Sequence, residues 1–224
     1  MSKLVVSVKI GAIEAELEVP PGVTVLFGPS GAGKSRTLGC IAGLLVPERG
    51  RIALGDETWF DGESRTVPIH ERRVAYVFQS LALFPHMTAA ENVAYGLPRA
   101  LTKAERRERA EAMLAKMQVA KLADRKPRTF SGGEAQRVAL ARAFAMKPRV
   151  VLLDEPFSAL DFAMKKELLR EVGAELAREK VPAVLVTHQS EDAEVLGDRV
   201  VFMKDGRVTR TTSMADGPFK DSGR

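Results

Sequence analysis

Residues 28–35 read Gly28-Pro29-Ser30-Gly31-Ala32-Gly33-Lys34-Ser35. They match the pattern G-x-x-x-x-G-K-[ST], and they lie between a short apolar strand pattern, Val23–Phe27, and a segment with helical spacing, Ser35–Leu45. The glycines permit a tight turn, so that successive backbone N–H groups and the start of the helix converge on phosphate oxygens. We therefore expect a loop that binds nucleotide phosphates, with Lys34 at the β- and γ-phosphates and the Ser35 hydroxyl on Mg²⁺.

The loop alone does not identify the reaction, because phosphotransferases and GTPases share it. A second apolar strand, Val150–Leu153, ends in Asp154 and Glu155. If this strand lies beside the loop strand, Asp154 would reach the Mg²⁺, and Glu155 could orient and polarise an attacking water. The alternative is a pair of solvated acids at a strand end.

Ser131-Gly132-Gly133-Glu134 precedes that second strand. One interpretation is local: Ser131 caps a helix and Glu134 closes a capping box. The other uses the same geometry, because an exposed helix start with two glycines and a hydroxyl can bind a second phosphate. One chain cannot easily aim both helix starts at the same γ-phosphate, whereas a two-fold dimer can.

The rest of the chain alternates strand and helix patterns. Continuous apolar runs between helical segments are typical of a parallel, helix-covered sheet. Further strands are predicted at Leu4–Ile10, Ile13–Val19, Arg51–Phe60, Arg73–Phe78, Ala183–Thr187 and Arg199–Met203. This pattern predicts an α/β fold.

A helical lobe, at about residues 86–147, is predicted between two of the strands. Capping boxes of the form S/T-x-x-E mark three helix starts in it, at Thr88 with Glu91, Thr102 with Glu105, and Ser131 with Glu134. We expect one domain over residues 1–210 that contains this lobe, followed by a polar, flexible tail over residues 211–224.

Composition excludes several other classes. The 224 residues are 45% hydrophobic with a formal net charge of +5, and acids are interleaved with bases even over Lys103–Lys116, so we expect no nucleic-acid binding. The single cysteine, Cys40, cannot form an internal disulfide, which fits a reducing compartment. The apolar run Leu4–Val8 is too short for a secretory signal, and no stretch approaches the roughly 20 apolar residues of a membrane helix.

In this order the motifs resemble the nucleotide-binding subunit of an ATP-binding-cassette (ABC) transporter, up to about Val208. In that family's terms, residues 28–35 are the Walker A loop, residues 131–136 the signature, and residues 150–155 the Walker B strand with its catalytic glutamate. The resemblance implies a P-loop NTPase fold: a mostly parallel core sheet, an N-terminal antiparallel β subdomain and the inserted α-helical subdomain. It also implies ATP and Mg²⁺ as cofactors, ATP hydrolysis, and a second copy of the chain as partner.

The resemblance assigns further roles. Gln79, of the Q-loop, would contact Mg²⁺ and the water, His188 would hydrogen-bond the γ-phosphate, and Asp161 would couple the two sites of a dimer. The implied catalytic residues are Glu155, His188 and Gln79, and the implied metal ligands are Ser35, Gln79 and Asp154. The implied nucleotide contacts are Gly28, Pro29, Ser30, Gly31, Ala32, Gly33, Lys34, Ser35, Arg36, Ser131, Gly132, Gly133, Glu134, Gln136 and Asp161.

Three positions depart from the family pattern. Arg36 replaces a small hydroxyl residue, Glu134 stands where glutamine is more frequent, and no aromatic residue precedes Phe27 to stack on adenine.

Arg72–Gln79, Leu83–His86 and Glu91–Val93 resemble importers, and the stretch from Gly50 to Phe84 is most similar to the ATPases of molybdate importers. Sulfate, ferric iron, polyamine and sugar importers are the alternatives. The resemblance implies transmembrane permease subunits, an extracytoplasmic solute-binding protein, and a cytoplasmic location on the membrane through the permease. A soluble ABC ATPase and a phosphate-loop kinase are the competing classes. The signature, residues 158–161 and His188 argue against the kinase.

Overall fold

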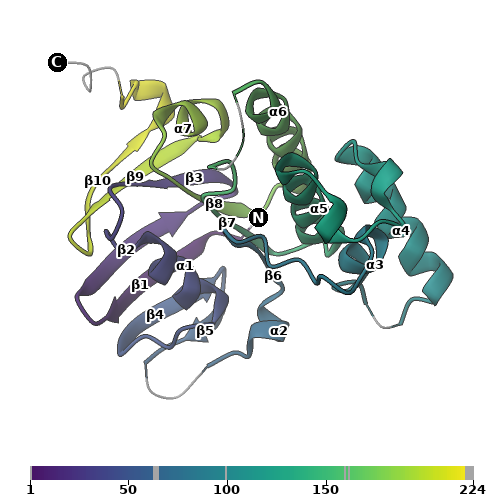
Figure 1. Ribbon diagram of the computed structural model, residues 1–224. Helices are drawn as coiled ribbons and strands as arrows, with labels where there is room; N and C mark the ends of the chain where they lie inside the picture. Colours follow the sequence, from purple (N-terminus) through teal and green to yellow (C-terminus); the bar gives the residue numbers. More distant parts are fainter. Residues whose placement is uncertain (1, 63–65, 99, 159, 161, 220–224) are drawn as a thin grey trace.

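The computed structural model describes residues 2–62, 66–98, 100–158, 160 and 162–219 (Figure 1). Over these residues the strands form one sheet in the order β5-β4-β1-β2-β10-β9-β3-β8-β7-β6. The strands are β1 (Leu4–Ile10), β2 (Ile13–Val19), β3 (Gly22–Phe27), β4 (Arg49–Leu54), β5 (Glu57–Phe60), β6 (Val74–Val77), β7 (Val150–Asp154), β8 (Pro182–Thr187), β9 (Arg199–Lys204) and β10 (Arg207–Ser213). The α-helices are α1 (Lys34–Ala42), α2 (Ile69–Arg72), α3 (Ala89–Ala94), α4 (Lys103–Lys116), α5 (Gly132–Ala145), α6 (Phe162–Glu179) and α7 (Ser190–Leu196).

The half of the sheet that runs from β9 to β6 is parallel, as predicted. Its register pairs Phe27 with Thr187, and Asp154 with Val186. The carboxyl ends of β3, β7 and β8 therefore lie at one edge of the sheet. The residues that follow these strands meet there, as is usual for ligand sites in such sheets.

The other half of the sheet is antiparallel and contains β1, β2, β4 and β5. It joins the parallel half through the β9–β10 hairpin: β10 pairs antiparallel with β9 and touches β2 at Arg207 and Glu14. The predicted antiparallel β subdomain and parallel core are thus both present, within one continuous sheet.

Alternate residues of the central strands enter two different apolar cores. Val151 and Leu153 of β7 pack with the core that includes α5 and α6, whereas Val150 and Leu152 pack with the core that includes α1. A strand that is buried on both faces reads as a continuous apolar run, which is the pattern seen in the sequence.

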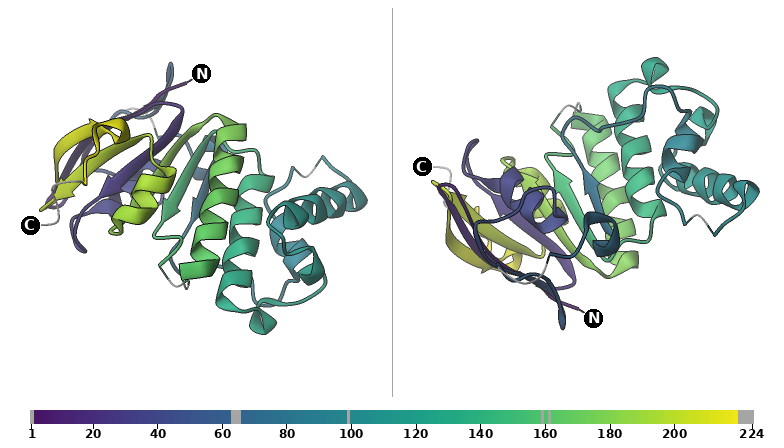
Figure 2. Two further views of the ribbon diagram at one scale, coloured as in Figure 1. Left: turned by 90° about the horizontal axis from the view of Figure 1, so that it is seen from above. Right: turned by 90° about the horizontal axis from the view of Figure 1, so that it is seen from below.

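The helical lobe lies beside the parallel half of the sheet. Figure 2 shows α6 and α5 side by side, with α3 and α4 on the side of α5 away from the sheet. The three predicted capping boxes are all present, because the Thr88, Thr102 and Ser131 side chains each accept a backbone N–H while the glutamate three residues later accepts the N–H of the cap.

Two predicted boundaries are wrong. The single strand predicted over Arg51–Phe60 is a hairpin, β4 and β5, that turns between residues 54 and 57 at Gly55, whose φ is +58°. The polar tail predicted from residue 211 instead continues β10 to Ser213 and forms a short 3₁₀ helix, Met214–Asp216. Phe219 then packs on Phe27, with ring centroids 4.8 Å apart.

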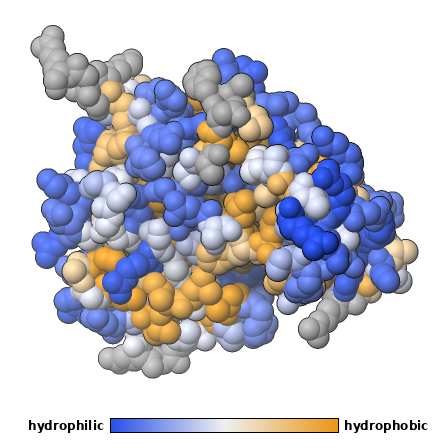
Figure 3. Space-filling model, viewed as in Figure 1, coloured by the Kyte–Doolittle hydropathy of each residue, from blue (hydrophilic) through white to orange (hydrophobic). Residues whose placement is uncertain are grey.

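The surface shown in Figure 3 includes an apolar area in the region of α1 and α2, where Leu44, Val46 and Ile69 are exposed. Exposed apolar side chains of this kind are common on globular proteins and assign no function by themselves. Among the described residues, no helix has both the length and the apolar character needed to cross a bilayer.

Candidate nucleotide-binding site

A cleft of about 650 Å³ opens at the carboxyl edge of the parallel strands. Four groups of residues line it: the β1–β2 turn, the predicted phosphate loop, two of the predicted catalytic residues, and the β9–β10 turn. The β1–β2 turn contributes Ala12 and Ile13, and the β9–β10 turn contributes Asp205 and Gly206. The phosphate loop and the start of α1 contribute Ser30, Gly31, Gly33, Lys34, Ser35 and Arg36, and the two catalytic residues are Gln79 and Glu155. The sequence did not single out Ala12, Ile13, Asp205 or Gly206.

The phosphate loop has the backbone that its glycines permit. Gly33 is the residue before α1 and has φ +99°, a backbone conformation that residues with a Cβ rarely adopt. A Cβ on Gly28 would lie 2.0 Å from the carbonyl oxygen of Met203, so only glycine fits there. The loop therefore turns sharply from β3 into α1, and the start of α1 faces the cleft.

Lys34 is nearly buried at the first position of α1. Its Nζ donates to the carbonyl oxygens of Gly28 and Pro29, at 2.8 Å each. Burial lowers the pKa of Lys34, while the nearby carboxylates of Glu155 and Asp154 act in the opposite direction. Gly28 and Pro29 thus hold the lysine through their backbones.

Asp154, at the end of β7, is held by two hydroxyl groups. Ser35 Oγ donates to its Oδ1 at 3.0 Å, and Tyr76 Oη donates to its Oδ2 at 3.1 Å. Burial raises the pKa of Asp154, and these two hydrogen bonds partly offset that increase by stabilising the carboxylate. Burial and the nearby Asp154 both raise the pKa of Tyr76, so this hydroxyl stays protonated and donates. Tyr76 was not predicted from the sequence.

Ser35 and Asp154 also fit the predicted magnesium ion. Both present oxygen atoms, the ligand type that Mg²⁺ prefers, and their hydrogen bond at 3.0 Å places the two groups side by side. Gln79, the third predicted ligand, is exposed at the end of β6 and lines the same cleft.

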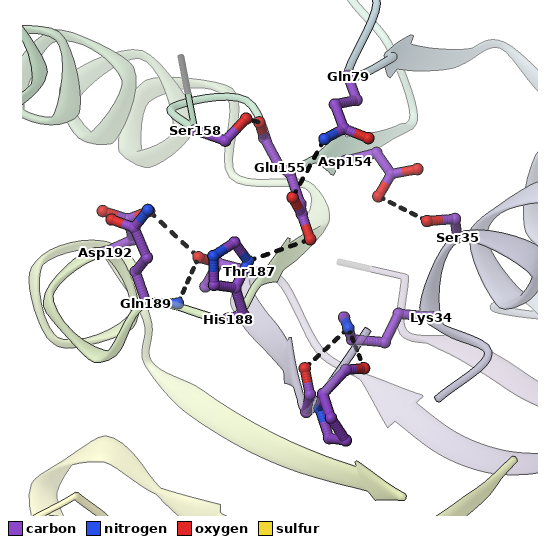
Figure 4. Close-up of polar contacts among 12 residues, drawn as sticks. Lys34, Ser35, Gln79, Asp154, Glu155, Ser158, Thr187, His188, Gln189 and Asp192 are labelled. Atoms are coloured by element: carbon purple, nitrogen blue, oxygen red, sulfur yellow. Dashed lines mark hydrogen bonds and ion pairs between the residues drawn. The ribbon is translucent and has the colours of Figure 1, made fainter. Parts of the chain in front are cut away.

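The three predicted catalytic residues converge (Figure 4). Gln79 Nε2 donates to Glu155 Oε2 at 3.3 Å, and His188 Nδ1 lies 3.2 Å from Glu155 Oε1. Because an ionised carboxylate only accepts, the hydrogen of that second contact belongs to His188 Nδ1. Glu155 itself has φ +46° and donates its N–H to the Val186 carbonyl at 3.0 Å. A strained residue held in this way is typical of a functional site.

A buried network supports the residues on both sides of His188. Thr187 Oγ1 accepts the N–H of Gln189 and donates to Asp192 Oδ2 (Figure 4). The other oxygen of Asp192 pairs with Lys165 Nζ at 2.5 Å, and the same ammonium contacts the Gln189 side chain. This network connects α6 and α7 to the end of β8, and so fixes the backbone that carries His188.

The opposite end of α1 is also fixed. Arg72 is almost fully buried, and its guanidinium donates to the carbonyls of Cys40, Ile41 and Val67 at 2.8–3.0 Å. The Cys40 and Ile41 carbonyls belong to the last turn of α1, where carbonyls lack their usual partner four residues on, although the Cys40 carbonyl also accepts the N–H of Gly43 at 3.1 Å. A cation at this end also complements the helix dipole. Arg72 thereby anchors the helix whose start faces the cleft.

The predicted signature lies outside this cleft. Ser131 and Gly132 are exposed at the start of α5, and none of residues 131–136 lines the cleft of its own chain. A Cβ on Gly132 would meet nothing within 4 Å, so the helix start is open. Glu134 takes part in the capping box and pairs with Lys121 at 3.4 Å.

Two further predictions concern Gln136 and Asp161. Gln136 is buried on α5, and its predicted nucleotide contact stays a prediction. Asp161, predicted to couple two sites, lies outside the described residues. Among the remaining predicted contacts, Arg36 lines the cleft, whereas Ala32 is buried and does not line it.

Known proteins are similar to the chain in sequence. Residues 14–158 match the family model described as ABC transporter. The chain is 41% identical over 212 residues to "Molybdenum import ATP-binding protein ModC" of Thiobacillus denitrificans, covering 94% of this chain and 57% of the relative. It is 44% identical over 200 residues to "Fe(3+) ions import ATP-binding protein FbpC" of Rhizobium etli, covering 88% of this chain and 55% of that relative. The chain thus spans a little over half the length of these relatives.

Solved structures share its fold over nearly the whole chain. The dimeric post-hydrolysis state of the ATP-binding cassette MJ0796, bound to ADP and Pi, superposes with a TM-score of 0.81 at 30% identity, covering 96% of this chain and 99% of that one. The predicted P-loop ABC-ATPase fold is therefore confirmed. The family match, the relatives and this fold agree that the chain belongs to the ABC transporter family.

Proposed function

We propose that the chain is the ATP-hydrolysing subunit of an ABC importer. The observation that carries this proposal is the position of Glu155, whose carboxylate lines the phosphate-loop cleft with one oxygen on Gln79 and the other on His188. A carboxylate held at both oxygens beside a phosphate site is suited to accept a proton from water.

In the proposed reaction, a water oxygen attacks the γ-phosphorus of ATP, and the bond to the β-phosphate bridging oxygen breaks. Glu155 orients the water and accepts its proton, and the products are ADP and inorganic phosphate. Gln79 and His188 hold the Glu155 carboxylate in one orientation, and Lys34 exchanges its two loop carbonyls for phosphate oxygens. Ser35 and Asp154 would hold Mg²⁺, which when bound neutralises phosphate charge.

A second copy of the chain completes each site in this proposal. The start of α5 is exposed and does not line the cleft of its own chain, so Ser131 and Gly132 are available to a nucleotide on a partner. Backbone N–H groups and the dipole at a helix start favour an anion. The dimeric form of the similar MJ0796 cassette supports this arrangement.

We further propose that the dimer drives permease subunits at the cytoplasmic face of a membrane, together with an extracytoplasmic solute-binding protein. Molybdate is the solute we favour, because the ModC proteins are molybdenum import proteins by name and match up to 96% of this chain. Ferric iron is the second candidate, supported by the similarity to FbpC.

The substitution Glu155→Gln tests the catalytic assignment. Because the amide cannot accept the proton of water, ATP hydrolysis should fall by at least about 100-fold while ATP binding persists. ATP-loaded dimers should then accumulate in light scattering. Glu194→Gln, an exposed position on α7, is the matched control and should behave as the parent. Parental turnover in Glu155→Gln would refute the role of this carboxylate.

A further inference from the structure

The cleft has two ends, and the catalytic residues identify one of them. Under the proposed function, Glu155 and Gln79 mark the end where the γ-phosphate reacts, and the phosphate loop contributes Ser30, Gly31, Gly33, Lys34 and Ser35 to the lining. The other lining residues are Ala12, Ile13, Arg36, Asp205 and Gly206, from the two β-turns and the first turn of α1. A nucleotide whose terminal phosphate faces Glu155 must place its ribose and base toward this second end.

Arg36 is the side chain at that end best suited to contact a base. A Cβ built on Gly11, in the β1–β2 turn, would lie 3.8 Å from its Nη2 and 4.0 Å from its Nη1. The guanidinium therefore extends from α1 toward this turn, beside the apolar side chains of Ala12 and Ile13. Within the described residues, the guanidinium of Arg36 forms no hydrogen bond or ion pair with the protein.

The β1–β2 and β9–β10 turns pack against each other beside Arg36. Gly206 accepts the N–H of Glu14 at 2.8 Å, and a Cβ on Gly206 would lie 2.4 Å from the Ala12 carbonyl oxygen. Ile13 packs on the phosphate loop, since a Cβ on Gly33 would lie 2.7 Å from its Cγ1. This side of the cleft is thus built from backbone and small or aliphatic side chains, none of which presents a flat π surface.

We propose that the Arg36 guanidinium stacks on the face of the nucleotide base. A planar, weakly hydrated cation without a protein partner is well suited to this contact. Any base presents such a face, so the contact should favour nucleotides over free polyphosphate without strong selection between adenine and guanine. The inference rests on the proposed nucleotide site, and it adds how that site holds the base.

Calorimetry on the full chain, with ATP, GTP and inorganic tripolyphosphate, separates this contact from a phosphate contact. We expect Arg36→Ala to lower the affinity for ATP and the affinity for GTP about tenfold each, and to leave the affinity for tripolyphosphate unchanged. Arg36→Lys keeps the positive charge but lacks the planar guanidinium, so its affinities for ATP and GTP should be as low as those of Arg36→Ala. Arg36→Tyr restores a flat surface and should recover most of the ATP affinity. Arg170→Ala, an exposed arginine on α6, controls for the lost charge.

The remaining outcomes would overturn the proposal. If Arg36→Ala weakens tripolyphosphate as much as ATP, and Arg36→Lys restores both, Arg36 contacts phosphate and not the base. If Arg36→Ala changes neither affinity while Lys34→Ala weakens both, the nucleotide site stands and the stacking is wrong. If the parent chain binds neither ATP nor tripolyphosphate, the proposed function fails, and the stacking contact fails with it.

Discussion

Removing the carboxylate of Asp192 is the most informative test of the support beneath His188. Asp192 is 2% exposed and its partner Lys165 is 7% exposed, with 2.5 Å between Nζ and Oδ1. The substitution Asp192→Ala leaves the Lys165 ammonium buried without its counter-charge, and it also removes the acceptor of the Thr187 hydroxyl. Breaking one side of a buried ion pair costs about 3–5 kcal/mol.

That loss is large for a chain whose unfolding free energy is expected to be about 5–15 kcal/mol. At about 2–4 °C per kcal/mol for a domain of this size, the melting temperature should fall by about 6–20 °C. Urea unfolding followed by circular dichroism measures the free energy. Glu194→Ala, exposed on the same helix, is the control and should change stability by less than about 0.5 kcal/mol.

A double substitution distinguishes an unpaired charge from a simple cavity. Lys165→Met with Asp192→Leu removes both charges and keeps side-chain volume, so most of the lost stability should return. An Asp192→Ala variant that loses less than about 1 kcal/mol would refute the reasoning, because the pair would then contribute no more than an exposed one. A double variant as unstable as the single one would refute it equally.

Three further predictions concern the site and the core. Ser131→Ala removes the cap of α5 and should lower the free energy of unfolding by about 1 kcal/mol. If Ser131 also contacts a partner's nucleotide, light scattering should show weaker ATP-dependent dimerisation of this variant. A Ser131→Arg variant with full dimerisation and turnover would exclude that contact. Tyr76→Phe removes a hydrogen bond that lowers the pKa of Asp154, so this pKa should rise further and the acid limb of the ATPase pH profile should move to higher pH, while an unmoved limb would show that Asp154 does not need to ionise. Burial raises the pKa of Cys40 to about 11, so a thiol reagent at pH 8 should label it only after unfolding, and fast labelling of the folded chain would contradict its burial.

Local signals in the sequence predicted local structure well. The capping boxes at Thr88, Thr102 and Ser131 were confirmed, because each depends on residues within one helical turn. The roles of Gln79 and His188 came from the resemblance to ABC transporter subunits, and their convergence with Glu155 follows from the topology, since each of the three residues follows a strand of the parallel sheet. Parallel strands place such residues at one edge whatever the packing details.

Other features depend on neighbours that are distant in sequence. Tyr76 reaches Asp154 because β6 pairs with β7 in a register that aligns Tyr76 with Leu152, and no pattern near Tyr76 encodes that register. Strand β10 reads Arg-Val-Thr-Arg-Thr-Thr-Ser and is mostly exposed, so it lacks the apolar alternation of a half-buried strand. The hairpin with β9 supplies its stability instead.

The position of that hairpin constrains the order in which the molecule can form. Strands β2 and β3 are joined by only residues 20 and 21, yet β9 and β10 lie between them in the sheet. On a ribosome, both strands are made early and must wait with open edges until residue 213 has emerged. Open edges invite pairing with other chains, and late closure between distant segments is slow. The edges of β2 and β3 are therefore exposed to pairing with other chains until β9 and β10 have been synthesised.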